Sequence, residues 1–298
     1  MKKLILFGVS ILLSTGIFSQ VVRNVRTISI DKSKIEQELL DEATIRSTYK
    51  FTQPVTVNDE IMNLSDTMTL DIGPKVSRYY DWTRIRRDST FASNMNNKLN
   101  PNAIRSMTVI KDQTSAPSST GIGTGFESSN RGETAQLFKN RKKQEIIIID
   151  RAEGSIDPYK CTEKVAPQQW EITSDTLTVL GYLCQKATTS FRGRNYIAWF
   201  TSDIPVNDGP WKFYGLPGLI LKVNDSENLF SFEIVGLEQL QPPTNIFMAK
   251  DDYVNCKRKD IEKLRAKRSG GMAVQINGGD VVIRQKANNT KYTPLEKD

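Results

Sequence analysis

The chain has 298 residues, of which 38% are hydrophobic and 25% charged, and its formal net charge is +7 at pH 7. This composition is typical of a folded protein, and the length suits one large domain or two modest ones. The sequence contains no histidine, which excludes Ser-His-Asp and Cys-His catalysis and every histidine-ligated metal site.

The first residues predict a secretory signal. Two lysines precede an apolar run at residues 4–13, and small and polar residues follow. This order is typical of a signal peptide, and the run is too short for a spanning helix. We therefore assign residues 1–19 to a signal peptide and expect no integral membrane segment after its cleavage. Because an exported protein rarely meets nucleic acid, we interpret basic runs such as 139–144 as solvated surface and expect no nucleic-acid partner.

Residues 20–250 are predicted to form a single β-rich domain. An alternating strand is expected around residues 45–51, and residues 67–85 also have a β pattern. The Asn-rich stretch 90–107 has some helical character. Residues 112–134 are rich in Ser, Thr and Gly, so we expect a flexible insertion there.

From residue 144 onward the pattern is clearly β. Short apolar or alternating runs follow one another, joined by turn signals such as Arg-Gly-Arg at 192–194. Closely spaced strands with short turns indicate an antiparallel meander rather than βαβ units. The predicted fold class is therefore mainly β, a curved antiparallel sheet with a few peripheral helices. The expected strands are 145–150, 159–164, 168–173, 178–191, 195–203, 218–223 and 229–240.

Residues 251–298 are predicted to form a helix and a tail. Asp251 or Asp252 can cap the helix, basic residues lie in its last turns, and Gly270-Gly271 ends it. Its apolar stripe is thin, so we expect it to dock weakly or at an edge. The remaining residues add one strand and the tail.

The three cysteines leave two alternatives open. Export permits a disulfide, and an odd count leaves one thiol over. Cys161 and Cys184 lie in the most strand-like part of the chain, so we predict that they pair. The alternative is that all three cysteines are unpaired.

The sequence has no strong cofactor or metal motif. The run GIGTGF at 121–126 lacks the third glycine of a dinucleotide-binding loop. The acidic runs 203–209 and 224–228 lack EF-hand spacing and suit turns between strands. We therefore expect no cofactor and no metal. An acid pair of the glycosidase type stays open, and its candidate members are Asp203, Asp208, Asp225 and Glu233.

Aromatic residues are concentrated between 170 and 232. Both faces of the strand around 195–200 are apolar, which indicates either a strand covered on both sides or a concave sheet that holds an apolar ligand. In the segment GPWKFYGLPGLILKV at 209–223, we predict that Gly215 and Gly218 turn the chain, because a Cβ there would be strained or would block close packing. The candidate lip of a binding pocket consists of Tyr196, Trp199, Trp211, Phe213, Tyr214, Leu216 and Pro217.

This region resembles the GLPGLI family of exported Bacteroidota proteins. The motif that names the family is present at residues 215–220, and the resemblance is specific over about residues 168–240. It implies an antiparallel β protein similar to the open half-barrels of periplasmic lipoprotein carriers. It also implies export to the periplasm or cell surface of a Gram-negative bacterium, and it brings no agreed activity and no catalytic residues. The flanking matches are Gly181-Tyr182, Cys184, Lys186-Ala187, Gly193-Arg194, Trp199, Asp203–Pro205 and Gly209-Pro210.

Three functional hypotheses follow. The first is a non-enzymatic envelope protein that binds an apolar or peptidic ligand, or a partner protein, on a curved β-sheet. The second is a structural or accessory subunit of a cell-envelope assembly, which would dock through the aromatic residues. The third is a histidine-free hydrolase that depends on carboxylates.

Overall fold

The computed structural model describes most of the chain, which divides into two compact units. The larger unit comprises residues 32–88, 131–268 and 288–298, and the smaller one includes residues 89–130 and 269–287. The predicted signal peptide lies outside the described residues. These are 36–57, 59–98, 105–112, 124–129, 132–150, 158–265, 271–277, 280–286 and 290–297.

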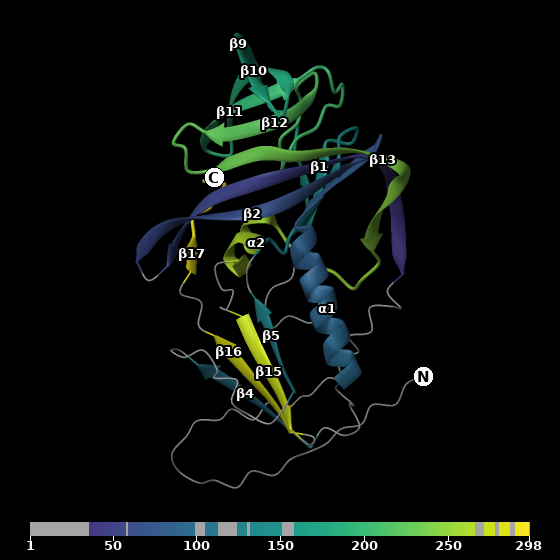
Figure 1. Ribbon diagram of the computed structural model, residues 1–298, viewed down its shortest axis with the longest axis vertical. Helices are drawn as coiled ribbons and strands as arrows, with labels where there is room; N and C mark the ends of the chain where they lie inside the picture. The colour runs from purple at the N-terminus through teal and green to yellow at the C-terminus, as the bar shows by residue number, and fades with distance from the viewer. Residues whose placement is uncertain are drawn as a thin grey trace. The chain divides into compact units, whose positions relative to one another are not determined.

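One large open sheet forms the larger unit (Figure 1). Its strands run in the order β14-β8-β7-β6-β3-β2-β1-β13-β12-β11-β10-β9, and β17 pairs with β1 outside this path. Neighbours are antiparallel except β14 and β8, which are parallel. The predicted class, a mainly β open half-barrel, is confirmed. The strands are β1 (Gln37–Val57), β2 (Glu60–Ile72), β3 (Val76–Tyr80), β6 (Gln136–Asn140), β7 (Glu145–Asp150), β8 (Tyr159–Lys164), β9 (Glu171–Val179), β10 (Tyr182–Phe191), β11 (Arg194–Thr201), β12 (Leu219–Asp225), β13 (Ser231–Ala249), β14 (Val254–Asn255) and β17 (Thr290–Tyr292).

The long strands β1 and β13 form the middle of this sheet. Their register shifts at three places, and such bulges bend a strand and increase its twist. The rings of Phe51 and Phe232, which are register partners, stack with centroids 4.5 Å apart. Cross-strand aromatic pairs of this kind stabilise a sheet and fix its register.

Two tight hairpins shape one end of the sheet. The β10–β11 turn has positive φ at Arg192 (51°) and Gly193 (73°), as two-residue hairpins require, and the predicted turn is confirmed. The β9–β10 turn also has positive φ at two adjacent residues, Leu180 and Gly181. The prediction of a single strand over 178–191 is therefore wrong, because the chain reverses at this pair.

The helices and a second sheet complete the described structure. The helices are α1 (Trp82–Lys98) and α2 (Arg258–Arg265). The Asp260 carboxylate accepts from the Lys257 N–H (3.0 Å), so α2 begins later than predicted, after β14. The smaller unit has a sheet in the order β4-β16-β15-β5. Its strands are β4 (Ser106–Asp112), β5 (Thr124–Ser129), β15 (Gly271–Asn277) and β16 (Asp280–Lys286).

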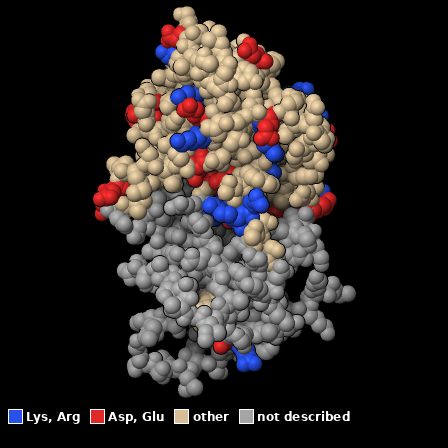
Figure 2. All heavy atoms as spheres, in the orientation of Figure 1, with Lys and Arg blue, Asp and Glu red and all other residues tan. Residues whose placement is uncertain are grey.

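Within the described residues, neither helix is long and apolar enough to cross a membrane. On the face of the molecule seen in Figure 2, Lys and Arg side chains are interspersed with Asp and Glu.

The predicted Cys161–Cys184 disulfide is wrong. Cys161 lies on β8 and Cys184 on β10, which are separated by many strands in the sheet order. Both are buried and free, and Cys256 is also free and half-buried. Burial raises the pKa of Cys161 and of Cys184 to about 11 and raises the pKa of Cys256 as well.

We predict that the protein, purified without reductant, has three reactive thiols when unfolded and almost none when folded. A pKa of about 11 against an ordinary value of 9.0 lowers the thiolate fraction of Cys161 and Cys184 at pH 8 about a hundredfold. A chromogenic thiol assay with and without denaturant measures both numbers. A count of one in denaturant would show that two cysteines are oxidised.

Candidate functional site

An aromatic cluster lies where the candidate pocket lip was predicted, and Phe213 is its centre. The Phe213 ring centroid lies 4.8 Å from that of Tyr196, 5.2 Å from Trp211 and 6.0 Å from Phe232. All three pairs are edge-to-face, the arrangement that the quadrupoles of aromatic rings favour. Phe213 has no exposed surface, so its ring is fully used in packing.

The structure buries most of the predicted lip. Tyr214 and Leu216 are buried, Trp199 and Trp211 are half-buried, and Pro217 is exposed. Because the rings contact one another, the buried members belong to a filled core. A hollow of about 330 Å³ lies elsewhere, beside Leu39, Leu40, Asp41, Glu42, Thr44, Pro74 and Lys75.

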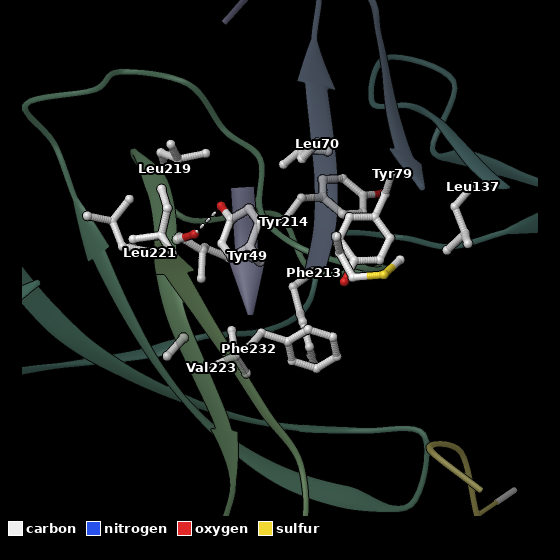
Figure 3. Close-up of a cluster of buried hydrophobic side chains, with 14 of the residues drawn as sticks. Tyr49, Leu70, Tyr79, Leu137, Phe213, Tyr214, Leu219, Leu221, Val223 and Phe232 are labelled. Carbon is white, nitrogen blue, oxygen red and sulfur yellow. Dashed lines mark hydrogen bonds between the residues drawn. The ribbon is translucent and has the colours of Figure 1, made fainter. Parts of the chain in front are cut away.

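The same core continues along β12 (Figure 3). The Tyr49 hydroxyl donates to the main-chain carbonyl of Ile220 at 2.8 Å. Burial raises the pKa of Tyr49 well above its ordinary value, so the phenol stays a hydrogen-bond donor. This contact ties β1 to the strand that follows the glycine-rich corner.

Gly215 and Gly218 form the corner, and each has a reason to lack a side chain. Gly215 has φ +107°, in the region that favours glycine. A Cβ on Gly218 would lie 2.0 Å from the carbonyl oxygen of Thr201. The N–H of Leu219, the next residue, donates to the main-chain carbonyl oxygen of Ile204 at 3.0 Å. The motif thus forms a tight corner packed against the end of β11.

A buried ion cluster, which the sequence analysis missed, precedes this corner. The Asp208 carboxylate is fully buried and accepts from Lys139 (2.5 Å) and Arg141. Burial alone would raise the pKa of Asp208, but the two cations more than offset this effect, so its pKa lies below the ordinary value. Lys139 is 1% exposed. The interpretation of residues 139–144 as solvated surface is therefore wrong at this position.

The cluster also holds the main chain in place. The Lys139 ammonium donates to the carbonyl oxygens of Gly209 (2.5 Å) and Phe213 (3.3 Å). Arg141 donates to the carbonyl of Gly73 (2.5 Å) in the turn between β2 and β3. Charge-assisted bonds of this kind are stronger than neutral ones. The bonds from Lys139 fix the loop that carries Phe213 against β6.

The carboxylates considered for hydrolysis face cations or solvent. Asp225 is buried beside Arg194 (3.5 Å), Glu233 pairs with Lys222 (3.0 Å), and Asp203 is exposed. A general acid in a glycosidase needs a raised pKa. The pKa of Asp208 is lowered instead, which suits a structural anion.

Strand β9 presents an edge of the large sheet (Figure 1). Among the strands that the structure describes, it pairs with β10 alone. Leu177 and Ile172 are register partners of the buried Cys184 and Ala187, and cross-strand partners lie on the same face of a sheet. Leu177 is nevertheless 38% exposed and Ile172 46% exposed. This edge therefore combines main-chain groups that have no strand partner with an apolar rim on the core side.

Comparisons with known proteins give one family match. The sequence profile of a family described as "Protein of unknown function (Porph_ging)" matches residues 191–222, from the β10–β11 hairpin into β12. This match fits a protein of the Bacteroidota. No curated protein matches the chain.

Two solved structures are similar to the chain. They are "Structure of PNGF-II in P21 space group" and "Structure of PNGF-II in C2 space group", with sequence identities of 17% and 16%. Both have a TM-score of 0.41, and each comparison covers 74% of this chain. The chain spans 33% of the length of the PNGF-II chain.

We predict that Asp208→Ala lowers the free energy of unfolding by about 3–5 kcal/mol, because it leaves the Lys139 ammonium buried without its counter-ion. Urea denaturation measures this loss. Replacing both residues, as Lys139→Met with Asp208→Leu, should recover part of it. The control is Asp175→Ala, which removes an exposed partner of Lys186 and should leave the midpoint unchanged. Equal midpoints for the two single variants would contradict the role of the cluster.

We also predict that Gly218→Ala destabilises the protein by at least about 2 kcal/mol, because the new methyl group collides with the main chain of Thr201. Gly236→Ala is the matched control, since its Cβ would lie 3.5 Å from the nearest atom, on Thr48. Its effect should stay within about 1 kcal/mol. If both variants unfold at the same urea concentration, the corner tolerates a side chain.

Proposed function

We propose that the protein is a non-enzymatic exported protein that binds a partner by accepting one of its extended segments as a new strand beside β9. The observation that carries this proposal is the β9 edge with its apolar rim. Extended peptides commonly bind by adding a strand to an exposed sheet edge, where main-chain hydrogen bonds give affinity and alternate side chains give specificity.

The composition of β9 supports this use. Natural edge strands avoid unwanted pairing with lysine, proline or short length. The sequence EITSDTLTV at 171–179 contains neither lysine nor proline, and the charge of Asp175 is matched by Lys186 at 2.8 Å. A partner strand with apolar side chains would cover Ile172 and Leu177, which lie on either side of a register shift in the β9–β10 pairing.

The aromatic cluster favours a peptide or protein over a small apolar ligand. Phe213 and Tyr196 are almost completely buried against other rings, so the residues predicted to line a pocket already satisfy one another. The β9 rim, in contrast, leaves apolar surface without cover. Of the ligand classes considered from the sequence, an extended protein segment therefore fits these residues best.

We further propose that the protein belongs to the GLPGLI family and acts in the periplasm or at the cell surface of a Gram-negative bacterium. The signal-like residues 1–19 support export. The tight corner at 215–220, which lies inside the matched span 191–222, supports the family.

Site-specific crosslinking tests the edge. A photo-reactive amino acid at Leu177 should give an adduct in cells, and the adduct should map to an extended partner segment with apolar residues. The control is the same amino acid at Val235, which is 53% exposed but lies on the interior strand β13. Equal adducts at both positions would indicate non-specific contact and contradict the proposal.

A binding measurement completes the test. A synthetic peptide of the mapped segment should bind the wild-type protein, and Leu177→Lys should weaken binding at least about tenfold, because it places a charge in the apolar rim. The variant's thermal transition serves as the folding control. A partner that stays bound through purification would identify a subunit of a stable envelope assembly.

A further inference from the structure

Residues 294–297 lie against the β10–β11 hairpin, and the hairpin recognises their main chain. The Arg194 guanidinium donates to the carbonyl oxygens of Pro294 (2.9 Å) and Leu295 (3.1 Å). The Tyr196 hydroxyl also donates to the Leu295 carbonyl, at 3.3 Å. Buried side chains of β11 therefore form hydrogen bonds with two adjacent peptide groups of the segment.

The hairpin turn holds the next part of this segment. The N–H of Lys297 donates to the carbonyl oxygen of Arg192 at 3.0 Å. A Cβ on Gly193 would lie 2.8 Å from the Lys297 Cβ, so only glycine allows this approach. The turn thus supplies a hydrogen-bond acceptor and, at Gly193, the space for the segment to approach.

Glu296 supplies the acidic side chain of the segment. The residue is 8% exposed, and its carboxylate accepts from Lys212 (2.5 Å) and Arg258. Burial alone would raise the pKa of Glu296, but Lys212 and Arg258 offset this effect and hold it below its ordinary value. The segment therefore inserts an ionised carboxylate between two cations.

Two of the buried cations that contact the segment also have other ion partners. Without the segment, Lys212 would still pair with Glu163, and Arg194 would still pair with Asp225 (3.5 Å) and Glu227 (3.3 Å). The buried cations thus keep counter-ions when the segment leaves. The charged side chains around the segment are Arg192, Arg194, Lys212 and Arg258, with Glu163, Asp225 and Glu227. The segment adds both signs to them, because Glu296 lies between Lys212 and Arg258 whereas Lys297 pairs with Glu227 (3.2 Å).

We propose that this groove is a peptide-binding site for extended segments that carry an acidic side chain directly after an apolar residue, and that residues 294–297 are its tethered occupant, which a free peptide of the same chemistry can replace. The site is independent of the β9 edge. Because the occupant is tethered, its effective concentration is high, and a free peptide competes only when the tether is cut or the occupant is weakened.

The experiment starts from the full folded chain. A protease recognition sequence inserted between Asn288 and Asn289 allows the tether to be cut after folding. The cut protein is then titrated with a fluorescein-labelled peptide of residues 289–298, and binding is followed by fluorescence anisotropy. A second peptide with Glu296→Gln is the matched control, since it keeps the shape and removes the charge.

We expect the cut protein to bind the native peptide with 1:1 stoichiometry and the Gln peptide at least tenfold more weakly. The uncut protein should bind the native peptide at least tenfold more weakly than the cut one. Equal binding of the two peptides, or no binding to a folded cut protein at millimolar peptide, would overturn the proposal. So would a cut protein that unfolds and is not restored by the native peptide.

The full chain with Glu296→Gln gives an independent readout, because its occupant lacks the recognised charge. It should bind the native peptide more tightly than the wild-type chain does, whereas Glu60→Gln, an exposed acid on β2, should behave as wild type. The bound carboxylate has a lowered pKa, so affinity should be full above the free value of about 4.3 and fall as the pH drops through the lower bound value. Affinity that does not change between pH 7 and pH 3 would show that Glu296 is not the recognised group.

Discussion

The carboxylate of Asp208, enclosed in an apolar core, is the constraint on which the rest of the site depends. A buried carboxylate is very unfavourable unless cations and hydrogen bonds compensate it. Lys139 and Arg141 provide this compensation from β6 and the turn after it, and they also bond the main chain at Gly209 and Gly73. One anion therefore fixes three segments that are far apart in the sequence. Phe213 follows the anion closely, so the cluster also sets the position of the aromatic centre.

An open sheet must end twice, and the two ends of this one differ. At one end, the two-residue strand β14 pairs with Tyr159 and Lys160 of β8 and is soon followed by α2. So short an edge offers little for another chain to pair with. At the other end, β9 is nine residues long and leads into the tight β9–β10 turn. The difference in length and in apolar rim explains why only one end is proposed to accept a strand.

Local features of the fold could be predicted from the sequence, and contacts over long distances could not. The Arg-Gly-Arg turn was predictable because positive φ at two adjacent residues is a local requirement, which Gly193 meets. The burial of Lys139 was not, because a lysine in the basic run KNRKKQ has the same pattern whether it faces solvent or an aspartate that is 69 positions away. Cysteine spacing likewise contains no information about strand order, so Cys161 and Cys184 were paired wrongly. The site at 294–297 was missed for the same reason, since its partners lie about a hundred positions earlier.

The β10–β11 hairpin adjoins both proposed binding surfaces, because β9 pairs with β10 and residues 294–297 contact β11, yet the structure gives a reason for the two surfaces to act independently. Two sites are coupled when each ligand orders or shifts an element that the other also uses. The hairpin is already ordered by its own packing, because Ala187 on β10 and Tyr196 on β11 are almost completely buried. A peptide held by Arg194 should therefore change the affinity of β9 for an added strand very little. The two surfaces also bind different chemical groups. β9 offers main-chain groups and an apolar rim, whereas the groove binds a negatively charged side chain. Two different extended segments can thus bind on either side of this hairpin, one at β9 and one against β11, without either one competing for the other's contacts.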